Sequence, residues 1–362
     1  MRRFALTMVR PAAFAAAIAL VFALISMTPA GAQTPTAKAP AAASKGYTAP
    51  RTSFGQPDLQ GVWTSGTVTP LERPEQFANK EFFTPAEAAE YERSRQAELN
   101  QDNRPGDRTK DVAAAYNDAW WDRGTRVIKT RRTSLVVDPP DGKIPARTPQ
   151  AQARLNAARA AQEKRCETAA CSEGTLSAAD GPEDRPPGER CIAWGTSVPP
   201  MMPSAYNNNY QIVQTPNNVA IVIEMIHDVR IIPIDGTPHL PSKIRPWFAD
   251  SRGHWEGETL VVETTNYNGM AAKPYDTSFK NASKNMRLVE RFTRTDAETL
   301  TYRYTVEDPE TFTRPFTVEV PLSRSSQPLY EHACHEGNYG MVGLLGGARE
   351  VEKKRAAGKS KN

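Results

Sequence analysis

The second half of the chain consists of short β-branched segments separated by turns, and this pattern constrains the fold more than any other feature. The turns include Pro216-Asn217-Asn218 and Asp235-Gly236. Strands joined by so few residues pair antiparallel, because parallel strands need long crossover connections. The segments that we predict as strands are residues 210–215, 219–227, 229–234, 259–265, 287–293, 299–306, 316–322 and 329–334.

A sheet with this many strands tends to curl, because closure removes its exposed edges. One motif in the first half favours a barrel over a sandwich: Gly61-Val62-Trp63 resembles the opening Gly-x-Trp of lipocalin-like barrels, where the tryptophan plugs one end. The alternative interpretation is an ordinary core tryptophan. We therefore predict a mainly β protein, an antiparallel meander closed or curled into a lipocalin-like barrel, with helical insertions in the N-terminal half.

Helices are expected before the meander. Thr84-Pro85-Ala86-Glu87 has the pattern of an N-cap, a first-turn proline and a capping-box acid, and predicts a helix that ends at about Leu99. An Ala- and Arg-rich segment predicts a second helix at 150–164. Residues 134–138 should form a strand that enters a tight turn. The Pro- and Gly-rich stretch 174–203 should be a long loop.

The beginning of the chain has the features of an export signal. Three arginines precede an apolar run that ends near Met27, and Ala30-Gly31-Ala32 then supplies small residues for cleavage. The run is too short to predict a membrane span, and no cysteine stands at the cleavage site, so no stable membrane anchor is expected. Residues 1–32 are therefore predicted to be a signal peptide, and the mature protein to be periplasmic or secreted.

Composition divides the remaining chain into four parts. Residues 33–52 contain almost no bulky apolar side chains and should form a disordered leader. Residues 53–205 should form a strand- and helix-containing region packed on the sheet, and 206–348 the antiparallel β domain. The charged residues 349–362 should form a disordered basic tail.

Charge argues against a nucleic-acid partner. The chain has 45 basic and 41 acidic residues, and loss of the three signal arginines leaves 42 basic residues against those 41 acids. A nucleic-acid binder needs a basic face, and none is visible in the sequence. The expected partner is a small-molecule substrate or ligand.

Four cysteines in an exported chain indicate two disulfides, because the compartment is oxidising. Of the three connectivities, we favour Cys166 with Cys171 and Cys191 with Cys334. The second bridge would tie the irregular central region to the segment that carries the last histidines. The rival interpretation is a thiolate metal site, for which Cys-x4-Cys alone is a weak signal.

All five histidines lie between His227 and His335, and two of them occur in the string His332-Ala-Cys-His335-Glu336. Imidazole is both the usual acid–base group near neutral pH and the commonest metal ligand. Two site chemistries stay open. One is a single divalent metal ion held by His227, His239 and His335; the other is metal-free acid–base catalysis by His335 with a glutamate.

The carboxylate in that catalytic set is Glu336 or Glu224. Glu224 lies in an apolar strand segment, where a buried carboxylate needs a partner such as Arg230 or a histidine. We predict that Arg230 binds an anionic or polar group. The other predicted substrate-binding residues are Asn208, Tyr210 and Trp247. The alternative interpretation is that they form turns or pack in the core.

Three longer motifs resemble a family of exported bacterial β-rich proteins of unassigned function. They are Glu-Met-Ile-His-Asp-Val-Arg-Ile-Ile-Pro-Ile-Asp-Gly at 224–236, Arg-Gly-His-Trp-Glu-Gly-Glu-Thr-Leu-Val-Val-Glu-Thr-Thr-Asn-Tyr-Asn at 252–268, and Cys-His-Glu-Gly-Asn-Tyr-Gly at 334–340. The resemblance extends over most of the chain beyond the leader. It implies export and a shared fold, but no particular reaction.

From these residues we expect an exported enzyme. It would be a hydrolase or lyase acting on a small organic or glycosidic substrate by His/Glu acid–base or metal-assisted chemistry. The alternative is a non-catalytic periplasmic binding protein for a small apolar ligand. A structural envelope protein is a third class that the sequence leaves open.

Overall fold

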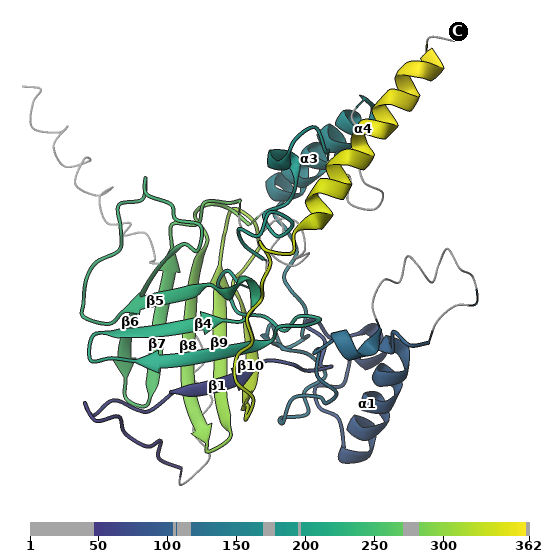
Figure 1. The fold of residues 1–362 in the computed structure, drawn as a ribbon. Helices are drawn as coiled ribbons and strands as arrows, with labels where there is room; N and C mark the ends of the chain where they lie inside the picture. Colours follow the sequence, from purple (N-terminus) through teal and green to yellow (C-terminus); the bar gives the residue numbers. More distant parts are fainter. Residues whose placement is uncertain are drawn as a thin grey trace, which may run out of the picture. The chain divides into compact units, whose positions relative to one another are not determined.

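The computed structural model describes residues 47–103, 106, 117–168, 178–194, 197–270 and 282–359. Its main element is an antiparallel sheet in the order β5-β4-β3-β1-β10-β9-β8-β7-β6, with a short β2 paired to β10 (Figure 1). The strands are β1 Gly61–Thr64, β2 Val136–Asp138, β3 Asn209–Gln214, β4 Asn218–Ile223, β5 Val229–Pro233, β6 Asp250–Glu256, β7 Thr259–Thr265, β8 Arg287–Asp296, β9 Thr299–Glu307 and β10 Phe316–Arg324.

The sheet curls until its two end strands, β5 and β6, contact each other. Side chains cross this contact, since Arg230 Nε of β5 donates to Ser251 Oγ of β6 at 3.0 Å. The result is a nearly closed barrel, and the predicted fold class is confirmed. The region before residue 206 also takes part in the sheet, because β1 lies between β3 and β10.

The two predicted helices begin close to where the local sequence signals place them. The helix α1 (Pro85–Leu99) carries the predicted capping box: Glu87 N donates to Thr84 Oγ1 at 3.3 Å, and Thr84 N donates to Glu87 Oε2 at 2.8 Å. The second predicted helix is α3 (Pro149–Thr168). Among the described residues, no helix combines the length and the apolar character that crossing a membrane requires.

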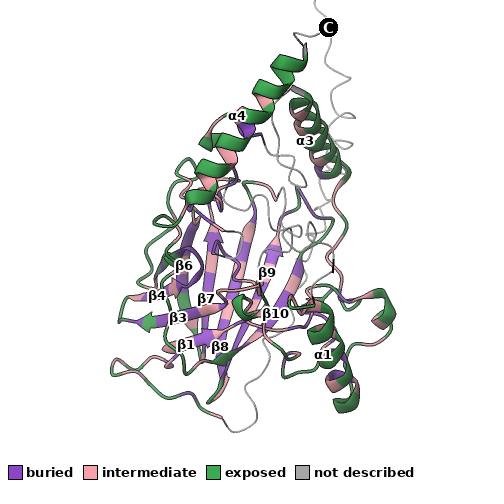
Figure 2. Cartoon of the chain, turned by 45° about the vertical axis from the view of Figure 1, so that its right-hand side comes forward, coloured by how far each residue is buried: buried purple, intermediate pink, exposed green. Residues whose placement is uncertain are grey.

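The C-terminal segment differs from its prediction. The helix α4 spans Tyr339–Lys359, so the residues expected to be a disordered tail from 349 begin inside it. Leu344 and Leu345 pack on Ala179, and Arg349 Nη2 donates to the Ala179 carbonyl at 2.7 Å. These anchors lie mostly before residue 349, which explains why the composition of the tail alone did not indicate a helix. Figure 2 shows how exposed most of α4 is.

Two other segments differ from their predicted strands. Residues 329–334 are irregular, and β4 ends at Ile223 instead of residue 227. The strand β6 was not predicted, because polar residues and Gly253 interrupt its β-branched pattern. A two-residue turn at Gly257 and Glu258 joins it to β7.

Trp63 belongs to the main core of the barrel. Its side chain is fully buried, its Nε1 donates to the Leu59 carbonyl at 2.9 Å, and the guanidinium groups of Arg294 and Arg324 each lie 5.7 Å from its ring centroid. Around it the strands direct large apolar side chains inward, including Phe292, Tyr302, Leu322, Ile212 and Ile221.

Side-chain alternation gives the strands of the barrel an inner and an outer face. On β6 and β7, Ser251 and Thr264 pair with each other and contact Arg230 in the interior. Their neighbours Asp250 and Glu263 therefore lie on the outer face. This division determines which of the predicted site residues can meet.

Candidate functional site

The connection between β4 and β5, residues 224–228, is a tight turn in a strained backbone conformation. The φ angles of Ile226 and His227 are 66° and 51°, in the left-handed region that β-branched residues rarely adopt. Such a conformation persists only where surrounding contacts enforce it, and it is concentrated at functional sites. Met225 and Ile226 are buried in the core, whereas His227 is exposed at the end of the barrel.

Glu224 holds the first half of this turn. Its Oε2 accepts hydrogen bonds from Asn209 Nδ2 at 2.8 Å and from Asn209 N at 3.2 Å, and its own N–H donates to the Asn209 carbonyl at 3.1 Å. The carboxylate is buried and its partner is Asn209, not Arg230 or a histidine as predicted. Glu224 thus acts first as a structural acceptor.

His227 is oriented by the C-terminal segment. Its Nδ1 lies 2.9 Å from the carbonyl oxygen of His332. A carbonyl only accepts, so Nδ1 carries the proton, and the neutral ring keeps its lone pair on Nε2. Because the ring is exposed, that nitrogen is available as a base or as a ligand.

His332 and His335 lie beside it, so three of the five histidines gather here. The rings of His227 and His335 are 6.3 Å apart between centroids. Burial lowers the pKa of His332 below its ordinary value, and the neighbouring His227 lowers it further when that ring is protonated. Its Nδ1 is buried and has no hydrogen-bond partner within the described chain.

The disulfide Cys191–Cys334 holds this segment in place, and its prediction is confirmed. Asn338 Nδ2 adds a hydrogen bond to the Glu189 carbonyl at 2.9 Å. The bridge places His335 and Glu336 on an exposed turn. Cys166 is also disulfide-bonded, and its predicted partner Cys171 lies outside the described residues.

Asp228 adjoins His227 in this cluster, and Asp122 lies near Glu224. Burial raises the pKa of Asp228, an effect that His227 only partly offsets, and Asp228 Oδ2 is a buried acceptor without a partner in the described part of the chain. Burial and the charge of Glu224 raise the pKa of Asp122. Neither aspartate was among the predicted site residues. Asp228 directly follows His227 in the motif at 224–236, so the sequence could have indicated it as a site residue. Nothing in the sequence indicates Asp122.

Three of the four residues predicted to bind substrate are engaged inside the protein. The Asn208 amide is fully buried and bonds the Ser204 N–H at 2.6 Å, the Ser204 carbonyl at 3.0 Å and the Asp122 carbonyl. Burial raises the pKa of Tyr210 to about 12, and its hydroxyl donates to the Met202 carbonyl at 3.4 Å. Trp247 stays partly exposed.

Arg230 is the third engaged residue. Its guanidinium is buried and forms a two-point ion pair with Glu290, one contact being Nη1 to Oε1 at 2.9 Å. Nη2 also donates to Thr264 Oγ1 at 2.7 Å. The prediction that Arg230 binds an anionic group of a substrate is corrected, because its donors are already occupied by barrel residues.

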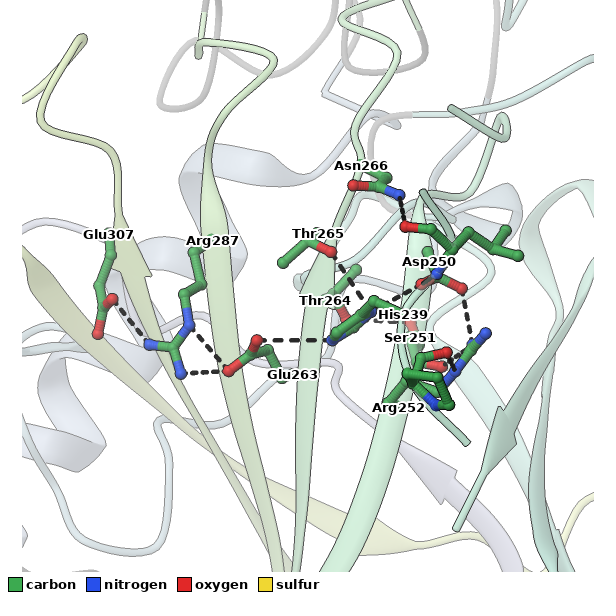
Figure 3. A network of polar contacts seen from close by, with 12 residues as sticks. His239, Asp250, Ser251, Arg252, Glu263, Thr264, Thr265, Asn266, Arg287 and Glu307 are labelled. Carbon is green, nitrogen blue, oxygen red and sulfur yellow. Dashed lines mark hydrogen bonds and ion pairs between the residues drawn. The ribbon is translucent and has the colours of Figure 1, made fainter. Parts of the chain in front are cut away.

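His239 belongs to a separate network on the outer face (Figure 3). Its Nδ1 lies 2.7 Å from Asp250 Oδ2 and its Nε2 lies 3.5 Å from Glu263 Oε1. Asp250 also pairs with Arg252 at 2.7 Å. Because Asp250 and Glu263 face outward, His239 is held away from His227 and His335, and the predicted metal triad is not assembled. Within the described ranges, no group of three or more His, Cys, Asp or Glu side chains has the arrangement to hold a metal ion.

Comparisons with protein-family models, with curated proteins and with solved structures found no match to this chain. The resemblance to exported bacterial proteins of unassigned function therefore stays a prediction, and function is argued from the site.

Proposed function

We propose that the protein is an exported enzyme, a hydrolase or a lyase, that acts on a small organic or glycosidic molecule by acid–base chemistry at His227. The observation that carries this proposal is the 2.9 Å contact between His227 Nδ1 and the His332 carbonyl at a strained backbone position. A base whose second nitrogen is fixed by a hydrogen bond is the usual arrangement of a catalytic imidazole.

In this proposal His227 Nε2 removes a proton from the substrate or from a water molecule. The reaction then needs an acid to protonate the leaving group. Asp228 is suited to that role, since it directly follows His227 and burial raises the pKa of its carboxyl above the ordinary aspartate value. The exposed imidazole of His335 lies beside that of His227 and would also contact the substrate.

The predicted metal-assisted route has less support. It needs three protein ligands around one ion, and His239 is engaged by Asp250 and Glu263 on the outer face. The residues present therefore do not fit the predicted site, and no step of the proposed reaction uses a metal.

The alternative, a binding protein with an apolar ligand inside the barrel, is also less favoured. The described interior is occupied by Trp63, Phe292 and Tyr302, and by the charged pair Arg230–Glu290. Burying an apolar ligand against that ion pair would gain less than burying it against apolar side chains.

A panel of chromogenic esters, glycosides and elimination substrates, combined with diethyl pyrocarbonate, tests the proposal. This reagent acylates accessible neutral imidazoles. Turnover of a panel substrate should fall in step with acylation of His227 mapped by mass spectrometry, and a His254→Asn control should be inactivated at the same rate. Turnover that survives complete acylation of His227 would contradict the proposal. A retained ligand with no turnover would favour the binding protein.

A further inference from the structure

Glu290 and Arg230 form a buried polar cluster that links five strands of the barrel. Glu290 is fully buried, and its Oε1 accepts from Arg230 Nη1 at 2.9 Å and from the Tyr302 hydroxyl at 2.7 Å. Its Oε2 accepts from Arg230 Nη2 and from Thr264 Oγ1 at 3.2 Å. Arg230 also donates to Ser251, so β5 is joined through side chains to β6, β7, β8 and β9.

This cluster lies at the seam of the barrel. In the described sheet, β5 has a backbone ladder with β4 and is an end of the strand order, as is β6. Arg230 holds β5 by hydrogen bonds across the seam. On the other side of the turn, Ile223 N donates to the Asp228 carbonyl at 2.8 Å.

The position of Arg230 in the chain connects the seam to the site. It is three residues from His227 and two from Asp228, at the start of the strand that leaves the strained turn. Glu224 and Asn209 hold the β4 side of that turn, and Arg230 holds the β5 side. A rotation of the first residues of β5 would change the direction of His227 and its contact with His332.

Stability alone explains such a pair poorly, because apolar residues of similar volume often stabilise a protein as well as a buried ion pair does. We infer that Glu290 is a positioning residue for His227: by fixing Arg230 across the seam, it fixes the strained turn that presents the imidazole. This inference rests on the proposed role of His227.

The double variant Arg230→Met/Glu290→Leu tests it, since it removes both charges and keeps their volume. We expect a folded protein in which ¹⁵N spectra of the histidines show that His227 no longer has a single Nδ1–H tautomer. For the panel substrate, kcat should fall at least about tenfold with little change in KM, because misplaced catalytic groups lose rate more than binding. The matched control is Arg303→Met/Glu319→Leu, which removes an ion pair of the outer face and should change neither readout.

A double variant that keeps the wild-type tautomer and kcat would overturn the inference. If the double variant does not fold, the same two readouts are measured on Glu290→Gln, which retains the shape of the side chain. A wild-type His227 tautomer in that variant would also overturn the inference. The tautomer is measured without any substrate. A failure of the proposed function, seen as full activity in His227→Asn, is thus distinguishable from a failure of this inference.

Discussion

His227 donates its Nδ1 proton to the carbonyl oxygen of His332, a residue 105 positions later in the chain. The donor lies on a strained turn between two strands, and the acceptor lies on an irregular segment fixed by the disulfide Cys191–Cys334. This contact leaves one imidazole nitrogen free at the end of the barrel.

Glu224→Gln separates a structural role of this residue from a catalytic one. The glutamine keeps an oxygen that can accept from Asn209, so we expect the turn to persist and kcat to stay within about tenfold of wild type. A catalytic acid or base would contribute about 10²- to 10⁴-fold. Steady-state kinetics on the panel substrate measure this, and a loss in the larger range would restore Glu224 to the catalytic set.

His332 should make stability depend on pH. Its pKa in the folded protein lies below the ordinary value of 6.5, so as the pH falls below 6.5 the unfolded chain binds the proton first. The free energy of unfolding should therefore decrease until the folded pKa is passed. Denaturant unfolding between about pH 8 and pH 5 should show a smaller decrease in His332→Gln than in wild type. Identical slopes would refute this assignment.

Asp228→Asn should stabilise the protein near neutral pH while lowering its activity. The folded pKa of Asp228 is raised above 3.8, so its carboxyl favours folding at low pH and this contribution is lost as the pH rises through the folded pKa. Removing the charge should raise the melting temperature at about pH 7 and have little effect at about pH 3. Calorimetry at both pH values measures the difference, and a lower melting temperature at neutral pH would contradict it.

The disulfide between Cys191 and Cys334 should contribute strongly to stability. It joins residues separated by 143 positions, and a loop of that size corresponds to about 5 kcal/mol in the loop-entropy model. Cys191→Ser/Cys334→Ser should lower the free energy of unfolding by that order, and Cys166→Ser, which opens a smaller predicted loop, should lower it less. An equal effect of the two changes would show that loop size does not explain the stabilisation.

Local signals in the sequence predicted the local structure well. The capping box at Thr84 fixes the start of α1 because its hydrogen bonds form within four residues. The strands β7 and β9 begin where predicted, because runs of β-branched residues and adjacent turns define them. In β6, Gly253 interrupts the alternation of apolar and polar residues that would indicate a strand. Because this strand was not predicted, the sequence could not show that Asp250 faces outward and holds His239 there.

The site was only partly predictable, because its decisive contacts join distant parts of the chain. Clustering in the sequence singled out His227 and His335 correctly as neighbours. The role of His332 depends on its backbone carbonyl, which carries no sequence signal. The partner of Arg230 is Glu290, and that pairing follows only from barrel closure and from the face on which each side chain lies.

The most direct test of His227 as the base is the variant His227→Asn. Asparagine tolerates the left-handed backbone at this position, and its amide can still donate to the His332 carbonyl, so the turn should keep its structure. The basic nitrogen is lost. We predict that kcat/KM for the panel substrate falls by about 10²- to 10⁴-fold with an unchanged melting temperature, and that His254→Asn on the outer face has no effect. Wild-type kcat/KM in a folded His227→Asn protein would contradict the account.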